Sequence, residues 1–297
     1  MTWEWKIGDP VDDANGGTMD AQNWHGDYYF EEDNRDESRI NNSKSNQYSK
    51  KAWDYYMDFK DEKALHYINM ALDLDERNSN NWNIKGLILA SLKRYEQSQE
   101  CFDKSLQLYP DNIVYDNKAR MLLKWSANLL QESKNVSNGL NKLQKAEEKI
   151  IKAINTLPGE NTEEILDRYL NQRDTVSYYI DYEKEYQNNL EILKACDKYD
   201  LFTITGTKFY ENSKKLHPGA PLKLLKEPDN EFDNDAIAIY FGDEKVGYVA
   251  NSDYTKHELT ASAFELQDKV PDSIQAEYLF FLSRYSPVQF NIGRIIR

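Results

Sequence analysis

A helical pattern that recurs every 34 residues limits what this chain can fold into more than any other feature of its sequence. One copy lies within residues 81–110. In it, aromatic and small residues alternate and a proline follows: Trp82, Gly86, Tyr95, Ser98, Phe102, Ser105 and Pro110. An earlier copy, 34 residues before, contains Tyr48, Ala52, Ala64, Ile68 and Ala71. A later half-copy, 48 residues after, contains Ala146, Ile150, Ala153 and Pro158. Helical units of this size bury their apolar faces only by stacking on one another, so residues 46–158 are predicted to form a helical solenoid.

These three copies resemble the tetratricopeptide repeat. Gly86 and Ala52 let the first helix of a repeat approach the second closely, and Pro110 and Pro158 end the second helices because proline lacks the backbone N–H. The third copy has 14 extra residues, which are expected around the polar segment QESKNVSNGL. Residues 162–196 are predicted to form a long capping helix, so that the repeat domain covers residues 46–199.

The resemblance also implies a groove lined by the first helices of the repeats, where a protein or peptide partner would bind. Its predicted lining residues are Asn46, Ser49, Trp53, Tyr56, Asn80, Asn83, Leu87 and Ala90. None of them is Lys or Arg, so a charged clamp for a peptide's terminal carboxylate is not expected here.

From about residue 200 the pattern changes to short alternating runs rich in β-branched and aromatic residues. Six such runs are predicted to be strands, and they lie at 201–210, 221–225, 236–241, 245–250, 274–282 and 288–296. One helix is predicted within 256–269. The fold class is therefore α+β and multidomain, with a small β-barrel over residues 200–297.

Residues 200–297 resemble the HIRAN domain. The residues that carry the resemblance follow the order expected for that family: Gly206, Lys208, Phe209, Gly219, Glu227, Pro228, Asn230, Phe232, Asp233, Ala236, Ile237, Val246, Gly247 and Tyr248. The resemblance is strong up to residue 250 and weak beyond it. It implies a modified oligonucleotide-binding barrel that binds the 3′ end of single-stranded DNA. Lys208 and Phe209 would then contact a phosphate and a base, Phe232 would stack on a base, and Asp233 would accept a hydrogen bond from the 3′-hydroxyl.

Asn230 and Tyr248 complete the predicted nucleic-acid site, and two departures from the family weaken it. Lys208 stands where arginine is usual, and lysine cannot form a bidentate contact with phosphate. The segment ENSKKLHPG is longer than in many members, and its Lys214, Lys215 and His217 are either phosphate contacts or ordinary exposed loop residues.

The carboxylates crowded into residues 227–235 admit three interpretations: a solvated turn, a metal loop, or the polar rim of a binding site. A calcium loop is excluded, because the sixth position from Asp229 is Asn234 and the twelfth is Tyr240. Asn230, Asp233 and Asp235 would also serve as local hydrogen-bond acceptors before the strand. That role is compatible with ligand binding.

The net charge of −14 argues against general nucleic-acid binding but leaves room for a small local site. Two cysteines, no leader-like start and no long apolar run favour a reduced cytoplasmic location without a membrane span. The sequence contains no catalytic, metal or cofactor motif, so we expect neither an enzyme nor a cofactor. The main alternative is a scaffold that binds only proteins.

Residues 1–45 are predicted to be an irregular segment, because they are rich in Gly, Asn and acidic residues. This segment nevertheless holds several aromatic residues, namely Trp3, Trp5, Trp24, Tyr28, Tyr29 and Phe30. We expect residues 1–30 to fold back onto the repeats, and the alternative is that these aromatic residues form a separate motif for binding a partner.

Overall fold

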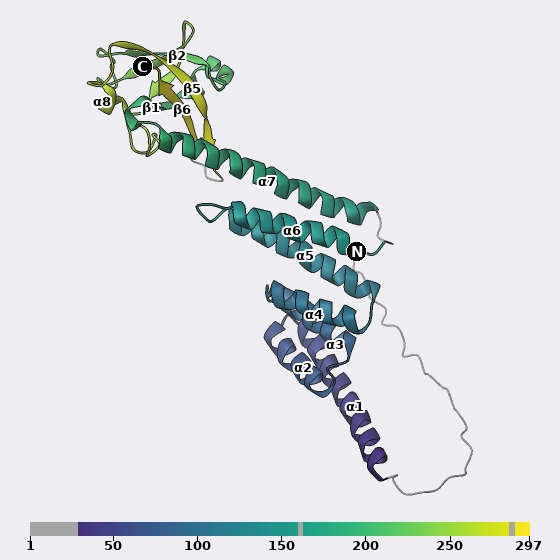
Figure 1. Cartoon of the computed structure of the whole chain (residues 1–297). Coiled ribbons are helices and arrows are strands. Elements are labelled where there is room, and N and C mark those ends of the chain that lie inside the picture. Colours follow the sequence, from purple (N-terminus) through teal and green to yellow (C-terminus); the bar gives the residue numbers. More distant parts are fainter. Residues whose placement is uncertain (1–28, 160–162, 285–288) are drawn as a thin grey trace.

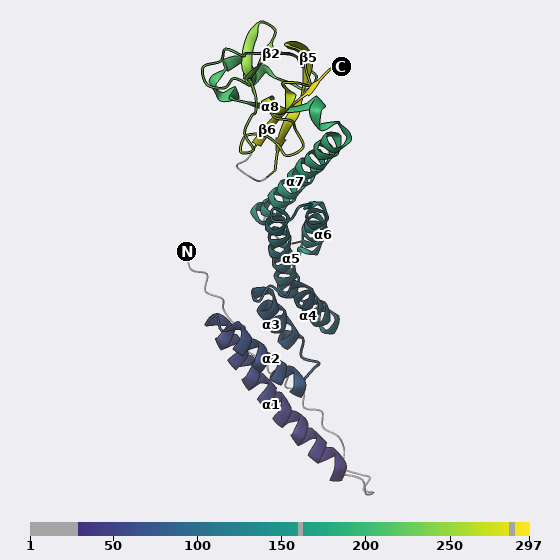
Figure 2. The same ribbon diagram turned by 90° about the vertical axis from the view of Figure 1, so that its left-hand side faces the viewer.

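A row of stacked helices carries a small barrel at one end (Figure 1). The computed structural model describes residues 29–159, 163–284 and 289–297. Its long helices are α1 (Tyr29–Met57), α2 (Asp61–Leu74), α3 (Ser79–Ser91), α4 (Tyr95–Leu108), α5 (Asn112–Ser133), α6 (Leu140–Thr156) and α7 (Glu163–Ala195). A view from the side shows the same elongated arrangement, with α7 joining the helical array to the barrel (Figure 2).

Helix α1 begins at Tyr29, so the prediction of an irregular segment through residue 45 is wrong for residues 29–45. Between Tyr29 and Met57 the sequence contains neither Gly nor Pro, so no helix-breaking residue interrupts α1. The polar composition of this stretch hid that continuity. Trp3, Trp5, Trp24 and Tyr28 lie outside the described residues, and the proposed docking of the tail stays a prediction.

The predicted close approach within a repeat is confirmed by the packing of α3 on α4. A Cβ atom placed on Gly86 would lie 2.8 Å from the ring of Phe102, so only glycine leaves room for that ring. Ser98 Oγ donates a hydrogen bond to the Gly86 carbonyl at 2.7 Å, which holds the two helices together. In the first repeat the equivalent pair is Ala52 and Ile68, and both side chains are fully buried. Ile68 is smaller than Phe102, which leaves room for the methyl group of Ala52.

The third repeat is longer because its helices are longer. The extra residues were expected in the segment around 131–140, yet α5 continues to Ser133 and α6 begins at Leu140. Only residues 134–139 separate the two helices. The added length therefore extends the α5–α6 pair rather than forming a large loop.

The turns between the paired helices of the first two repeats have the same structure. Phe59 and Lys93 adopt left-handed backbone conformations, with φ of 57° and 59°. In each turn the following N–H reaches back to the last helical turn, from Lys60 to the Tyr55 carbonyl and from Arg94 to the Leu89 carbonyl, both at 2.9 Å. These are Schellman motifs, which usually place glycine at this position.

The C-terminal part is a closed antiparallel barrel. Its strands are β1 (Leu201–Thr205), β2 (Pro221–Lys226), β3 (Ile237–Phe241), β4 (Glu244–Val249), β5 (Ser273–Ser283) and β6 (Gln289–Ile295), in the order β1-β4-β3-β2-β5-β6. The prediction of six strands and a small barrel is confirmed. Gly206, with φ of 75°, ends β1 earlier than predicted, and short 3₁₀ turns follow at Thr207–Phe209 and Glu211–Lys215.

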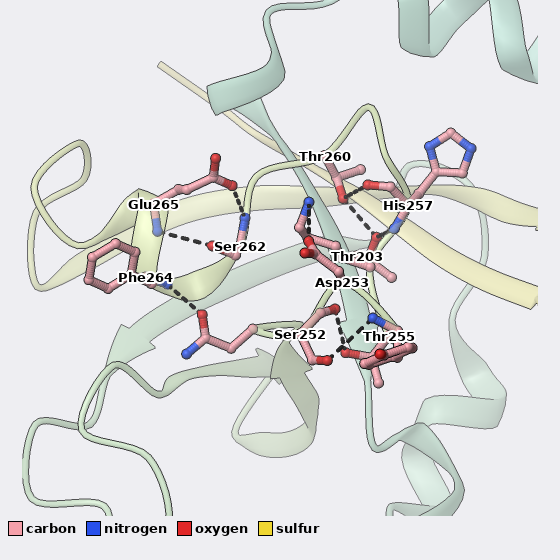
Figure 3. A network of polar contacts seen from close by, with 12 residues as sticks. Thr203, Ser252, Asp253, Thr255, His257, Thr260, Ser262, Phe264 and Glu265 are labelled. Carbon is pink, nitrogen blue, oxygen red and sulfur yellow. Dashed lines mark hydrogen bonds and ion pairs between the residues drawn. The ribbon is translucent and has the colours of Figure 1, made fainter.

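The helix predicted within 256–269 is shorter than expected, since α8 covers only Ala263–Leu266. The residues before it bond to β1 in addition to making short-range turn bonds, such as the one from the Thr260 N–H to the His257 carbonyl at 3.0 Å. The His257 N–H donates to Thr203 Oγ1 at 2.9 Å (Figure 3), and the Ala261 N–H donates to the Leu201 carbonyl at 2.9 Å. Contacts made across the fold thus replace local helical bonds.

Helix α7 is joined to the barrel by packing and by buried polar contacts. Leu193 packs in one apolar cluster with Leu201, Phe280, Leu282 and Ile292 of the barrel. The carboxylate of Glu183, which is 0% exposed, pairs with Arg284 at 3.1 Å, just after β5. This junction fixes the barrel on the end of the helical array.

No helix among residues 29–159, 163–284 and 289–297 has both the length and the apolar content needed to cross a bilayer. The same residues contain no cluster of three or more His, Cys, Asp or Glu side chains suited to holding a metal ion.

Candidate functional site

The loop between β2 and β3 is organised by Asn230. Its Oδ1 accepts hydrogen bonds from the backbone N–H groups of Phe232, at 3.0 Å, and Asp233, at 3.3 Å. Its Nδ2 donates to Glu227 Oε2 at 3.0 Å. The interpretation of Asn230 as a local hydrogen-bonding residue is therefore confirmed, and its amide has little capacity left for a ligand.

Two large aromatic rings of the barrel project into solvent. Phe232, at the tip of the Asn230 turn, is 94% exposed, and Phe209, in the turn after β1, is 75% exposed. The ammonium group of Lys208 lies 4.9 Å from the centre of the Phe209 ring. The barrel core contains neither ring, so packing does not account for their presence.

The carboxylate of Asp233 is half-buried and held on both sides. Its Oδ1 accepts from the Asp235 N–H at 2.9 Å, and its Oδ2 accepts from Asn251 Nδ2 at 2.9 Å. A carboxylate oxygen has two lone pairs, so each oxygen can accept one more hydrogen bond. The side chain therefore has a structural role and also remains able to bind a donor.

Asn251 was missed by the sequence analysis. It follows the Val-Gly-Tyr segment of β4 by three residues, and no local pattern connects it with Asp233, 18 positions earlier. Its other amide atom, Oδ1, accepts a hydrogen bond from the backbone N–H of Phe264 at 2.9 Å. Asn251 thus joins the β2–β3 loop to α8.

Tyr248 belongs to a polar cluster with Glu227 and Lys245. Lys245 donates to Glu227 Oε1 at 2.6 Å and to the Tyr248 hydroxyl at 2.8 Å, and that hydroxyl donates to Glu227 Oε2 at 3.1 Å. Burial works against both charges, but the hydrogen bonds to Lys245 raise its pKa and those to Glu227 lower the pKa of that carboxyl. The lysine is therefore committed to Glu227, which reduces what it can offer an incoming phosphate.

The loop residues proposed as further phosphate contacts have local partners or are simply exposed. Lys214 pairs with Glu211 at 2.9 Å, and His217 Nδ1 lies 3.1 Å from the Pro218 carbonyl oxygen. Lys215 is exposed. Nothing in the described residues directs these side chains toward Asp233.

The residues predicted to line the groove of the repeats differ in accessibility. Asn46 and Asn80 are exposed, and the rings of Trp53 and Tyr56 lie 5.5 Å apart. Leu87 and Ala90 are half-buried against the apolar core, and Ser49 and Asn83 are buried. Asn83 accepts a hydrogen bond from Asn117 of the next repeat at 3.1 Å.

Two family models match parts of the chain. Residues 201–257 match the HIRAN domain, and residues 79–112 match the tetratricopeptide repeat. The matched HIRAN segment contains the whole Asn230–Asp233 turn, Phe209 and Tyr248. No curated protein matches the chain.

Several solved structures are similar to the helical part. The tetratricopeptide domain of Arabidopsis OM64 is 16% identical, with 44% of this chain and 98% of that one covered and a TM-score of 0.32. The Yersinia enterocolitica type III secretion chaperone SycD is 16% identical over 45% of this chain and 83% of its own, with a TM-score of 0.33. The TPR2B domain of yeast Sti1, in complex with an Hsp70 peptide, is 13% identical over 45% of this chain and 98% of its own, with a TM-score of 0.31.

Proposed function

We propose that this chain, which joins a tetratricopeptide-repeat region to a HIRAN domain, is a non-enzymatic adaptor. The barrel binds the 3′ end of single-stranded DNA, and the repeats bind a protein partner. The partner would thereby be brought to a DNA end.

The observation that carries this proposal is a pair of exposed rings on the barrel, one of them adjoining a fixed carboxylate. Phe209 and Phe232 both present aromatic faces to solvent, and Phe232 precedes Asp233 in the chain. Stacking of a base on an aromatic side chain contributes about 1–3 kcal/mol and does not depend on the identity of the base. Two such rings support binding of single-stranded DNA without a sequence requirement.

Asp233 supplies the preference for an end. Its carboxylate accepts a hydrogen bond from a terminal 3′-hydroxyl and repels a phosphate in the same place. The bonds from Asn251 and from the Asp235 N–H hold the carboxylate in one orientation. A strand that continues past this point, or ends in a 3′-phosphate, would place a negative charge against it.

The affinity is expected to be low. Residues 200–297 contain 11 Lys and Arg against 15 Asp and Glu, so the domain as a whole repels a polyanion. Lys208 is the exposed cation nearest in sequence to Phe209, and it supplies attraction that falls as salt rises. We expect micromolar or weaker binding.

The test uses the full chain and a ten-nucleotide oligo(dT) that carries a 5′ fluorophore and either a 3′-hydroxyl or a 3′-phosphate. Fluorescence anisotropy should give an affinity at least about tenfold weaker for the 3′-phosphate, and a 5′-phosphate on an unlabelled competitor should matter less. Asp233→Asn should reduce this discrimination while the protein stays folded. Equal affinity for both 3′ ends would contradict the end-binding role.

Phe232→Ala should weaken binding of the same oligonucleotide about tenfold. Phe59→Ala is the matched control, since that ring is equally exposed but lies in the repeats, and it should leave the affinity unchanged. Equal losses in the two variants would mean that the effect does not come from the barrel.

A second candidate function is a scaffold that binds proteins only. The commitment of Lys245 to Glu227 and the carboxylates at Asp229, Glu231 and Asp233 favour it, because they weaken attraction for phosphate. Under this alternative no oligonucleotide binds even at low salt.

The repeats are proposed to hold an extended peptide through neutral side chains such as Asn46, Asn80 and Trp53. Since the predicted groove residues include no Lys or Arg, the peptide's terminal carboxylate should not matter. Acidic peptides with free and amidated C-termini, presented on an array, should therefore bind equally. A preference for the free terminus would contradict this.

A further inference from the structure

Phe264 is a third large ring that the barrel exposes, and it lies outside the segment that matches the HIRAN family. The ring is 68% exposed at the start of α8. A capping box holds the backbone there, because Ser262 Oγ accepts from the Glu265 N–H at 3.2 Å and Glu265 Oε2 accepts from the Ser262 N–H at 2.8 Å. Figure 3 shows the ring pointing away from this polar network. The backbone that bears the ring is thus held in place, and the ring itself is exposed.

Asn251 connects Phe264 directly to Asp233. Its Nδ2 donates to the Asp233 carboxylate, and its Oδ1 accepts from the Phe264 N–H, both at 2.9 Å. One amide side chain therefore separates the backbone of Phe264 from the carboxylate proposed to bind the 3′-hydroxyl.

Two further contacts fix α8 against the β2–β3 loop. Gln267 Nε2 donates to the Asp235 carbonyl at 2.8 Å, and Lys226 Nζ donates to the Gln267 carbonyl at 2.7 Å. The Phe232 turn and Phe264 are consequently parts of one hydrogen-bonded rim, which continues beyond the two rings already described.

The surroundings of Phe264 suit a base better than a phosphate. The nearby lysines are engaged with carboxylates, Lys198 with Glu265 at 2.5 Å and Lys256 with Asp253 at 3.2 Å. An uncharged ring whose neighbouring lysines are paired with carboxylates offers stacking but little attraction for a polyanion. Single-stranded nucleic acid characteristically stacks successive bases on such rings.

We propose that Phe264 is a stacking platform for a further base of the same single strand, and that Asn251 is the positioning residue that holds this platform and Asp233 in one frame. This inference rests on the proposed function of the barrel. The bound end is then longer than the Phe209 and Phe232 rings alone accommodate.

The experiment measures how well unlabelled oligo(dT) of two, four and six nucleotides, all with 3′-hydroxyls, displaces the labelled ten-nucleotide strand from the full chain. Phe264→Ala should weaken the six-nucleotide competitor about tenfold and leave the two-nucleotide competitor unchanged. Phe232→Ala should weaken both. Tyr254→Ala is the matched control, because that ring is 95% exposed in the adjacent turn and no contact of its side chain with Asn251 is seen in the described residues. This variant should change the affinity of neither the two-nucleotide nor the six-nucleotide competitor.

Salt gives an independent readout. The loss caused by Phe264→Ala should be the same in about 50 mM and about 200 mM salt, because stacking involves no ion release, whereas the loss caused by Lys208→Gln should shrink as salt rises. Phe264→Leu keeps an apolar side chain but has no aromatic face. It should bind the six-nucleotide strand as weakly as the alanine variant does, which would assign the loss to stacking and not to a folding defect.

Asn251→Ala should lower two quantities together: the preference for a 3′-hydroxyl over a 3′-phosphate, and the gain in affinity between two and six nucleotides. A purely structural residue would lower only the melting temperature. If Phe232→Ala weakens binding but Phe264→Ala does not, or if Tyr254→Ala costs as much as Phe264→Ala, the platform is refuted while the proposed function stands. If the unaltered chain binds no oligonucleotide, both fail.

Discussion

His257 is a buried side chain from which we predict that the stability of the barrel depends on pH. Its ring packs edge-on against Phe290 with 5.2 Å between centroids, and its Nδ1 accepts a hydrogen bond from the Leu259 N–H at 3.2 Å. Burial lowers the pKa of His257 below its ordinary value of 6.5. The folded state therefore favours the neutral ring, and protonation at Nδ1 would remove the acceptor.

We expect the barrel to be fully stabilised by this group above pH about 6.5 and to lose stability as the pH falls below that value, because the unfolded chain then binds a proton that the folded chain does not. Urea unfolding at pH 7.5 and 5.5, followed through the barrel, measures the difference. His257→Gln should be less stable at the higher pH but should lack this part of the pH dependence. An unchanged slope in the variant would assign the pH dependence to other groups.

Lys93 occupies a left-handed backbone conformation that glycine adopts more easily. Lys93→Gly should raise the free energy of unfolding by about 0.5–1 kcal/mol, because the strain of a side chain at positive φ is removed. Phe59→Gly should act in the same direction at the equivalent turn. Glu100→Gly, at an exposed position in the interior of α4, is the control and should destabilise by about 1 kcal/mol. Destabilisation by Lys93→Gly would show that the lysine side chain makes an essential contact.

At the scale of helices, the first two repeats make the same close contact between their paired helices with different pairs of residues. Gly86 faces Phe102, whereas Ala52 faces Ile68 at the equivalent positions. A methyl group at position 86 would collide with the Phe102 ring, and it fits where the facing side chain is smaller. The identity of the small residue is therefore coupled to the volume of its neighbour.

Gly86→Ala alone should destabilise the repeats by about 1–3 kcal/mol, since it overpacks the α3–α4 contact. Phe102→Ile alone should also destabilise, because it leaves a cavity. Together the two changes should cost less than the sum of the single costs, with a coupling of about 0.5–3 kcal/mol measured in a double-mutant cycle. Additive costs would mean that α3 shifts to accommodate the methyl group.

At the scale of the whole molecule, Glu183 holds together three segments that are distant in sequence. Besides the ion pair with Arg284, its Oε1 accepts from the Gly139 N–H at 3.2 Å and from Gln187 Nε2 at 2.9 Å. The α5–α6 connection, α7 and the end of β5 therefore meet at one carboxylate. The orientation of the barrel relative to the repeats depends on this contact and on the apolar cluster around Leu193.

Arg284→Met should destabilise the junction by about 3–5 kcal/mol, because it leaves a buried carboxylate without its cation. Adding Glu183→Gln to that variant should recover part of the loss by removing the charge. Hydrogen exchange of α7 amides measures the local stability, and small-angle scattering reports whether the barrel moves relative to the repeats. If the double variant is no better than Arg284→Met, the carboxylate is not the source of the cost.

The sequence by itself determined the repeats and the barrel strands, because both depend on local periodicity. The 34-residue spacing that relates Ala52 to Gly86 and Ile68 to Phe102, and the alternating runs after residue 200, are patterns that the sequence shows directly. The family resemblance likewise singled out Phe209, Phe232 and Asp233, whose binding role stays a prediction. Helix α1 was the local failure, since its polar composition concealed an uninterrupted helix.

Only the tertiary structure decided which polar side chains lie close together and which of them are already hydrogen-bonded or ion-paired to one another. Asn251 meets Asp233 from 18 residues away, Lys245 meets Glu227 from the same separation, and Arg284 reaches Glu183 across 101 residues. Such pairs have no signature in a short window, because their partners approach one another only after the barrel closes and docks on α7. The short length of α8 has the same cause: residues 257–261 bond to β1, and these bonds across the fold take the place of local helical ones.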